Sequence, residues 1–240
     1  MKYQIEKFNK GDIKKYNAEI KDMSSLEIIE WGFKTFKNQF GFTTSFGIQS
    51  SVLLHLIQNS SLKNKVKIFW IDTGYLPSET YIYANILIKQ LDLKIDVLQS
   101  EISPARMEAT FGKLWESKIP SDLDKYHQIR KIDPLEKALK KNKIFCWGSG
   151  VRSIQTSNRS KMNCIDIVRN TLSLRPLLGW SNKDIFYYMK ENNLPQHPLF
   201  HKGYSTVGDW HSSSAETYDK KGRNTRFGGL KQECGLHIND

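Results

Sequence analysis

Short apolar runs alternate with longer amphipathic segments along the chain, and this alternation predicts strands that are each followed by a helix. The apolar runs that we interpret as strands lie at 41–46, 66–71, 94–98 and 144–147. Helical spacing of apolar residues is found at 50–57, 78–91 and 185–190, and Ser50 and Ser51 are expected to cap the first of these helices. This order predicts the α/β class, with a largely parallel sheet and helices on both faces.

The alternation stops after Pro195, where glycine, serine, aromatic residues and histidine form an irregular stretch. We therefore expect two parts, an α/β domain over 1–200 and an active-site loop with a C-terminal tail over 201–240. A short terminal tail is usually mobile, so mobility is expected here too.

Composition restricts the class of protein. The 240 residues are 39% hydrophobic, which is ample for a core, and no apolar run approaches the roughly 18 residues of a membrane span. The first residues lack the apolar centre of a signal peptide, and the three cysteines have no motif spacing, so a reducing cytoplasm is expected. The net charge of +11 indicates an anionic partner. No nucleic-acid-binding motif accompanies this charge, so nucleic acid is not the expected partner.

A candidate phosphate-binding loop lies at 45–51, which reads SFGIQSS between the first strand and its helix. Gly47 lets backbone N–H groups approach an anion, and the helix N-terminus adds unpaired donors and positive dipole. Serine hydroxyls could complete the cradle, and the ligands proposed from this loop are Ser45, Gly47, Gln49, Ser50 and Ser51. Open α/β sheets bind ligands at this edge. The alternative is an ordinary strand-to-helix turn.

A second candidate anion site is the run GVRSIQTSNR at 150–159. Arg152 and Arg159 follow a strand and a glycine pair, and forked guanidinium donors suit phosphate or sulfate. The alternative for each arginine is a surface charge. Asp209 and His211, further along, could be ligands or could simply stiffen a long loop.

The tail sequence KQECGLH at 231–237 contains a cysteine that could act as a swinging nucleophile. Gly235 permits a tight turn after Cys234, and His237 would share a face with it in a helical turn. Arg223, Arg226 and Lys231 could neutralise a substrate and favour the thiolate, whereas Glu233 would raise the thiol pKa. The alternative is a stray surface cysteine.

Several of these motifs, in this order, resemble the phosphoadenylyl-sulfate reductase family of the adenine-nucleotide α-hydrolase-like superfamily. The loop at 45–51 is similar to a pyrophosphate loop in which Phe46 replaces a glycine and Gln49 replaces an aspartate. The other similar segments are DTGYLPSETY at 72–81, FGKLWE at 111–116, YSTVGDWHSS at 204–213 and ECGLH at 233–237. The resemblance implies further substrate ligands, namely Asp72, Thr73, Gly74, Lys131 and Gln155.

The resemblance also implies a reaction. Cys234 would attack the sulfur of 3′-phosphoadenylyl sulfate, and thioredoxin or glutaredoxin would release sulfite from the resulting S-sulfocysteine. No tightly bound cofactor is expected, because Cys146 and Cys164 have no neighbouring cysteine with which to hold an iron–sulfur cluster. Both are interpreted as inert core thiols. The family likeness further implies a homodimer.

Three other functions stay open on sequence alone. The chain could reduce adenylyl sulfate without a cluster, or could be a pyrophosphate-loop enzyme that modifies tRNA with ATP. It could also be a nucleotide-binding redox sensor that does not turn over its ligand.

Overall fold

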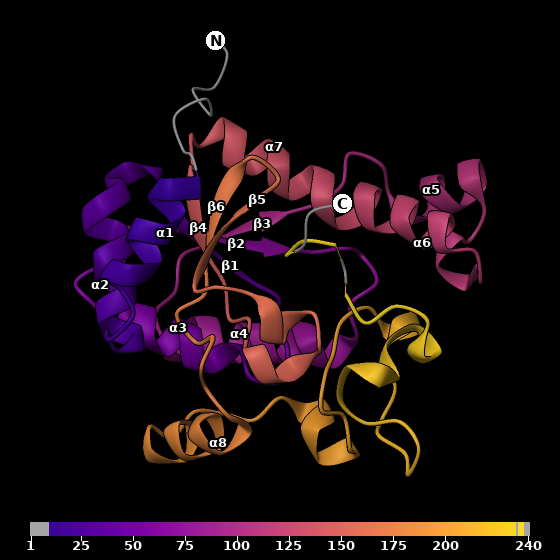
Figure 1. The fold of residues 1–240 in the computed structure, drawn as a ribbon. Helices are drawn as coiled ribbons and strands as arrows, with labels where there is room; N and C mark the ends of the chain where they lie inside the picture. Colours follow the sequence, from indigo (N-terminus) through magenta and orange to yellow (C-terminus); the bar gives the residue numbers. More distant parts are fainter. Residues whose placement is uncertain (1–9, 234, 238–240) are drawn as a thin grey trace.

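The computed structural model describes residues 10–233 and 235–237. Within these ranges, six strands form one sheet in the order β3-β2-β1-β4-β6-β5 (Figure 1). Their bounds are Phe40–Thr44 for β1, Lys67–Ile71 for β2, Ile95–Leu98 for β3, Cys146–Gly148 for β4, Ile165–Val168 for β5 and Thr171–Leu174 for β6. All neighbouring pairs are parallel except the edge hairpin of β5 and β6. The largely parallel sheet expected from the sequence is confirmed.

The described part of the chain contains eight α-helices, which lie around the sheet. Their bounds are Lys10–Glu19 for α1, Ser25–Phe36 for α2, Ser50–Gln58 for α3, Ser78–Gln90 for α4, Pro104–Phe111 for α5, Pro120–His127 for α6, Asp133–Lys141 for α7 and Asn182–Glu191 for α8. Shorter 3₁₀ segments lie at Lys37–Gln39, Leu114–Glu116, Ser153–Gln155, Arg159–Lys161, Pro198–Lys202, Trp210–Ser212 and Gly222–Gly229. No helix in the described ranges is long and apolar enough to cross a membrane.

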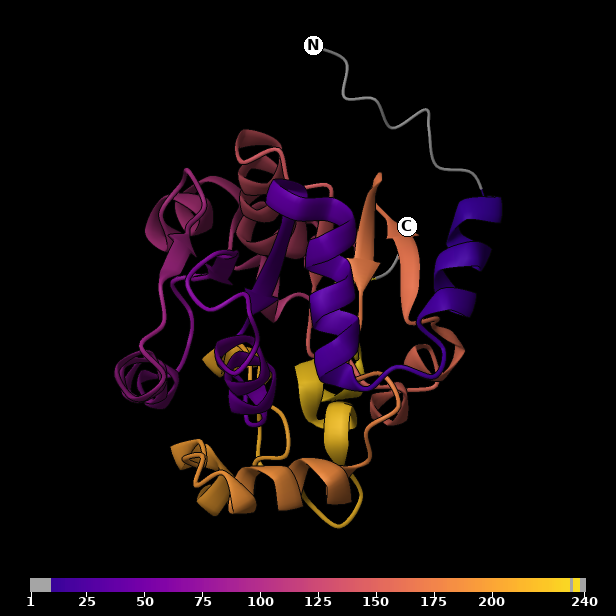
Figure 2. The same ribbon diagram turned by 90° about the vertical axis from the view of Figure 1, so that its left-hand side faces the viewer.

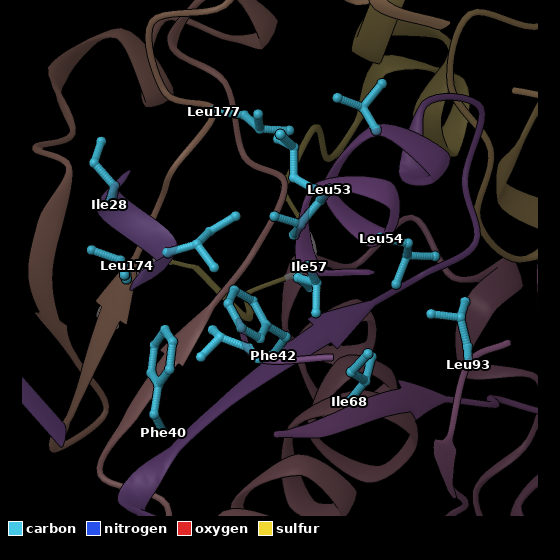
Figure 3. Packing of buried hydrophobic residues seen from close by; sticks show 14 of the residues in the cluster. Ile28, Phe40, Phe42, Leu53, Leu54, Ile57, Ile68, Leu93, Leu174 and Leu177 are labelled. Carbon is cyan, nitrogen blue, oxygen red and sulfur yellow. The ribbon is translucent and has the colours of Figure 1, made fainter. Parts of the chain in front are cut away.

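Alternate residues of the strands enter two separate cores, as the two-residue period of a strand requires. Ile68 and Trp70 of β2 face the larger core, which α2, α3 and α4 cover. Phe69 and Ile71 face the smaller core beneath α7. Helices therefore cover both faces, as expected, and Figures 1 and 2 show α7 on the opposite side of the sheet from α3 and α4. In Figure 3 the larger core is seen around Phe42, where α3 packs on β1.

One helix begins differently from the sequence prediction. Gln49 is the residue before the first turn of α3, and no side-chain hydrogen bond caps this end among the described residues. Ser50 and Ser51 lie one and two positions too late to act as caps, so that part of the prediction is wrong. The result leaves the positive end of α3 open toward a ligand.

Helices α6 and α7 are joined by a π-helical turn over Gln128–Ile132. Pro134 has no N–H to donate to the carbonyl of residue 130, and its ring crowds that carbonyl, so the regular α pattern cannot continue. The wider turn is closed by the Asp133 N–H, which donates to the carbonyl of Gln128. The turn buries Arg130 and Lys131, two cations that an exposed helix face would otherwise carry. Turns of this type often mark functional sites.

The segment after residue 200 packs against the sheet loops. The Trp210 N–H donates to the Tyr75 carbonyl, and the Tyr126 hydroxyl lies 3.0 Å from Nε2 of His211. The division at residue 200 stays a prediction, but the described part of 201–237 contacts the α/β sheet region directly.

His197 predicts a measurable loss of stability in acid. Its Nδ1 accepts the Leu199 N–H at 3.1 Å, so Nε2 carries the proton and lies 3.1 Å from the Thr80 hydroxyl. Burial lowers the pKa of His197 to about 4. Below an unfolded pKa of about 6.5, the unfolded chain binds a proton that the folded protein excludes, so stability falls with pH from about 6.5 to about 4. At pH 5.5 this loss is about 1.4 kcal/mol for one such histidine.

Urea unfolding between pH 7.5 and 4.5 measures this effect. His197→Asn keeps an oxygen that can accept the Leu199 N–H, and we expect a shallower pH dependence in this variant. An unchanged slope would show that His197 does not contribute to the acid sensitivity. The buried His127 contributes in the same direction, because burial lowers its pKa to about 3, so part of the slope is retained.

Candidate functional site

The candidate site is a cavity at the carboxyl ends of the parallel strands. Strands β2 and β3 lie on one side of β1, and strands β4 and β6 lie on the other. The order in which strands are added to the sheet therefore changes direction between β1 and β4. Ligands of open α/β sheets bind at such a switch point. The loops that follow β1, β2 and β4 all line the cavity, as do residues of the 205–209 loop and of the tail.

The loop after β1 places its polar groups toward the cavity. Phe46 adopts φ +45°, a left-handed conformation that is unusual for a bulky residue, and its buried ring packs edge-on against Trp70. Its burial between sheet and helix offsets this strain and fixes the turn. A side chain on Gly47 would come within 3.3 Å of the Ser45 hydroxyl, so the glycine keeps the loop tight. Ser45, Gly47, Gln49 and Ser50 line the cavity.

Gln49 and Arg152 connect the loops that follow β1 and β4. The Arg152 guanidinium donates to the Gln49 side-chain oxygen, to Asn182 Oδ1 at 2.9 Å and to the Trp180 carbonyl at 3.3 Å. No carboxylate in the described residues forms an ion pair with Arg152. A neutral amide at position 49 therefore orients Arg152 and leaves its charge available to an anion, which an aspartate would neutralise. Burial, together with nearby Arg159, lowers the Arg152 pKa to about 10, so Arg152 is still charged at neutral pH.

Lys131 reaches the cavity from the π turn. Its Nζ lies 2.6 Å from Oδ2 of Asp209, and Oδ1 of Asp209 accepts the Thr73 hydroxyl at 2.5 Å. Burial raises the pKa of Asp209, but the charges of Lys131 and His211 and the hydrogen bonds from Lys131 and Thr73 together outweigh burial and hold that pKa well below its usual range. Asp209 therefore connects the 205–209 loop both to the π turn, through Lys131, and to the loop after β2, through Thr73.

The cavity has a strong excess of positive charge. Five cationic side chains line it, whereas Asp209 is the one acidic side chain of its lining within the described residues. The five are Lys131, Arg152, Arg159, Arg223 and Arg226. Such a cavity favours a ligand with several negative charges.

The tail residues on both sides of position 234 are docked at the site. Glu233 is 6% exposed, and its carboxylate accepts hydrogen bonds from Arg159 and Thr156. The Gly235 carbonyl accepts two hydrogen bonds from Arg169, and His237 lies against Trp147 with 5.3 Å between ring centroids. Cys234 lies outside the described residues, so its role as nucleophile stays a prediction.

Most of the predicted ligands come together at the cavity. Those that line it are Ser45, Gly47, Gln49, Ser50, Thr73, Lys131, Arg152, Gln155, Arg159, Arg223, Arg226 and His237. Among these, Arg226 donates to the Ser212 and Ser213 hydroxyls, and Arg223 donates to the Gln232 carbonyl.

Four predicted ligands have other surroundings. Ser51 is fully buried in α3, and Lys231 forms an ion pair with Asp124 of α6. Asp72 accepts hydrogen bonds from Tyr81, Gln99 and the Gly74 N–H, so its carboxylate stabilises the turn that follows β2. Gly74 adopts φ +74° close to Arg130, where a side chain would clash with Pro104. None of these four lines the cavity.

The sequence reasoning missed several residues of the site. Ser149, Ser205 and Thr206 line the cavity with polar groups, and Arg130 holds the Thr73 carbonyl from the π turn. The glycines on either side of Ser149 indicate a loop at the end of a strand, where a ligand could bind. The local sequence around Arg130 does not indicate a site, because only the tertiary fold brings the π turn to the loop after β2.

The two remaining cysteines are poor nucleophiles. Burial raises the pKa of Cys146 well above its ordinary value and that of Cys164 to about 11, so both stay protonated at neutral pH. In the described ranges, no group of three or more His, Cys, Asp or Glu side chains is placed to hold a metal ion.

Comparison with known proteins decides the family. The model of the phosphoadenosine phosphosulfate reductase domain matches residues 39–215. The chain belongs to this family. It is 47% identical over 223 residues to the phosphoadenosine 5′-phosphosulfate reductase of Synechococcus sp., a match that covers 92% of this chain and 95% of that protein. The enzyme of the same name from Synechocystis sp. is 44% identical over 230 residues, which are 95% of this chain and 92% of that one.

The fold agrees with this family assignment. The crystal structure of phosphoadenylyl-sulfate reductase from Candida auris superimposes with a TM-score of 0.73 at 24% identity, over 86% of this chain and 98% of that one. The adenine-nucleotide α-hydrolase-like fold expected from the sequence is thereby confirmed. The family match runs from Gln39, the residue before β1, to Ala215, and therefore includes the 45–51 loop, Lys131, Arg152 and Asp209.

Proposed function

We propose that this chain reduces 3′-phosphoadenylyl sulfate to sulfite and adenosine 3′,5′-bisphosphate in sulfate assimilation, with thioredoxin or glutaredoxin as electron donor. The observation that carries the proposal is the cationic cavity at the switch point, with the described tail residues docked on it. The substrate has phosphate and sulfate groups, which such a cavity suits. The curated relatives named as reductases of this substrate support the assignment.

The polar groups of the cavity divide into two sets. The loop at 45–51, together with the open N-terminus of α3, is proposed to bind nucleotide phosphate through backbone N–H groups and the Ser45 and Ser50 hydroxyls. Lys131, Arg152 and Arg223 are proposed to hold the remaining anionic groups. Asp209 would keep Lys131 aimed at the cavity.

The proposed reaction has two nucleophilic steps. The Cys234 thiolate attacks the sulfate sulfur, a sulfur–sulfur bond forms, and the sulfur–oxygen bond to the phosphate breaks as adenosine 3′,5′-bisphosphate leaves. A thiolate of the dithiol donor then attacks the Cys234 sulfur and releases sulfite. The donor's second thiol resolves the mixed disulfide and regenerates Cys234, so the two electrons come from the donor's dithiol. No bound cofactor or metal takes part in this scheme.

The remaining parts of the proposal concern the partners and the compartment. Dependence on a reduced dithiol protein fits a cytoplasmic enzyme, since free thiols persist in a reducing compartment. A homodimer is proposed as the assembly. Neither a membrane nor a nucleic acid is needed for this reaction.

Mass spectrometry of the reduced protein mixed with 3′-phosphoadenylyl sulfate, without thioredoxin, tests the proposal. We expect a sulfonate adduct on the peptide that contains Cys234, and its removal by reduced thioredoxin. Sulfite formation without this adduct would contradict the mechanism. Adenylyl sulfate is the matched control substrate, and comparable rates with both substrates would contradict the assignment of the 3′-phosphorylated nucleotide. ATP–pyrophosphate exchange would instead indicate a tRNA-modifying activity.

A further inference from the structure

Glu233, the residue before Cys234, has an unusually complete set of partners for a tail side chain. One carboxylate oxygen lies 2.9 Å from Arg159 Nε and accepts the Thr156 hydroxyl at 2.8 Å. The other oxygen accepts from a terminal nitrogen of Arg159 at 2.8 Å. Glu233 and Arg159 are both nearly fully buried. Buried, two-pronged pairs of this kind fix geometry as well as charge.

The partner of Glu233 is itself held in place. The Arg159 guanidinium also donates to the Gln155 side-chain oxygen, and the Arg159 N–H donates to the Thr156 hydroxyl at 3.1 Å. Gln155 in turn accepts the Arg152 N–H at 3.0 Å. The loop at 152–159 is therefore a preorganised receptor for a carboxylate, built from the same segment that lines the cavity.

Three further contacts hold the described tail residues 232, 235 and 236. Arg223 Nε donates to the Gln232 carbonyl at 2.8 Å, and Arg169 donates to the Gly235 carbonyl at 3.0 Å. Leu236 packs on the core beneath α7. Of these anchors, the Glu233 pair is the one between a tail side chain and the cavity loop.

We propose that Glu233 is a positioning residue that docks the tail on Arg159, and that Arg159 serves as the receptor of the tail rather than as a ligand of the substrate. This inference rests on the proposed function, because it assumes that the tail delivers a thiol to the cavity. It reassigns one of the two arginines of the 150–159 run and leaves Arg152 for the anion.

The pairing also changes the electrostatic effect of Glu233 on the neighbouring thiol. An unpaired carboxylate next to Cys234 would raise the thiol pKa and reduce the thiolate fraction. When the Glu233 carboxylate is paired with Arg159, the guanidinium compensates its negative charge, so it raises the thiol pKa less. Arg159 is neutralised by this pair, and Arg223 also lies 3.9 Å from the second Glu233 oxygen, so Arg152 is the arginine of the 150–159 run that stays available to the substrate.

The rate of adduct formation on Cys234 in a single turnover tests this proposal. We expect Glu233→Ala to slow the step about 10²-fold, the scale of a small misplacement of a reacting group. The affinity for adenosine 3′,5′-bisphosphate should change by less than about twofold, because Glu233 does not line the cavity. Glu233→Gln keeps the shape and one of the two acceptor oxygens but loses the charge and the second acceptor, so it should fall between Glu233→Ala and the wild type. Thr156→Val removes the hydroxyl that donates to Glu233 and accepts the Arg159 N–H but keeps the Arg159–Glu233 ion pair, so it is a milder variant should Glu233→Ala unfold.

The charge-reversed pair Arg159→Glu with Glu233→Arg separates the two roles of Arg159. If Arg159 receives the tail, the double variant should form adduct about tenfold faster than Glu233→Arg alone. If Arg159 binds substrate, the second change gives no recovery, and the affinity of Arg159→Ala for the nucleotide falls at least tenfold; either result overturns the proposal.

Alkylation of Cys234 by iodoacetamide gives a readout that does not depend on the reaction. We expect Glu233→Ala to speed labelling of the Cys234 peptide about tenfold, because an undocked tail is more accessible. Equal labelling rates would overturn the docking role. If the wild type forms no adduct but labelling rises in Glu233→Ala, the proposed function fails and the docking role stands.

Discussion

Replacing Cys234 with serine is expected to abolish sulfite formation, with a loss of about 10³-fold or more, as is typical when a catalytic nucleophile is removed. A serine hydroxyl stays protonated at neutral pH, and it cannot form the sulfur–sulfur bond that the donor thiol later breaks. Binding of adenosine 3′,5′-bisphosphate should be retained, because the cations of the cavity are unchanged. Steady-state sulfite release and calorimetric nucleotide binding measure the two effects separately.

Cys164→Ser is the matched control for this change. The Cys164 thiol is raised in pKa by burial and lies 3.4 Å from the Arg175 carbonyl, a contact that a serine hydroxyl can also make. We expect this variant to keep its activity and to form the adduct on the Cys234 peptide. Full activity in Cys234→Ser would show that Cys234 is not the nucleophile. Lost activity in a folded Cys164→Ser variant would show that Cys164 takes part in the reaction.

The central part of the fold follows from the hydrophobic pattern, because the buried strands of a parallel sheet are apolar on both faces. The run at 66–71 predicted β2 to within one residue. The edge hairpin of β5 and β6 was not predicted, since Thr171–Leu174 is short and mixes polar with apolar residues. Its turn depends on Arg169 and Asn170, which both adopt positive φ, and the antiparallel pairing is decided by contacts across the sheet.

The site could be predicted in part, for reasons that particular residues illustrate. Gly47 and Arg152 belong to local motifs next to strand ends, so the sequence alone indicates that they lie at the ligand edge. The partners of Lys131 and Arg159 are 78 and 74 residues away along the chain, at Asp209 and Glu233, and only tertiary packing brings them together. Lys231 shows the opposite case, because its position in the tail indicated a ligand whereas the structure pairs it with Asp124.

Asp209→Asn is expected to destabilise the protein by about 3–5 kcal/mol, because it removes one partner of a buried ion pair. The change keeps the shape of the side chain and an oxygen that can accept the Thr73 hydroxyl. It leaves the Lys131 ammonium, which is only 7% exposed, without its carboxylate. The free energy of unfolding in urea at pH 7 measures the loss.

The double variant Lys131→Met with Asp209→Asn separates the structural role of this pair from its proposed role in binding. Methionine keeps an unbranched stem of similar length in the π turn, and no charge is left unpaired, so most of the lost stability should return. Sulfite formation should not return, because the cavity has lost a cation that faces the substrate. A double variant that regains both stability and activity would show that Lys131 only holds Asp209 in place. A single Asp209→Asn variant as stable as the wild type would show that water reaches the pair and that burial does not make it costly to break.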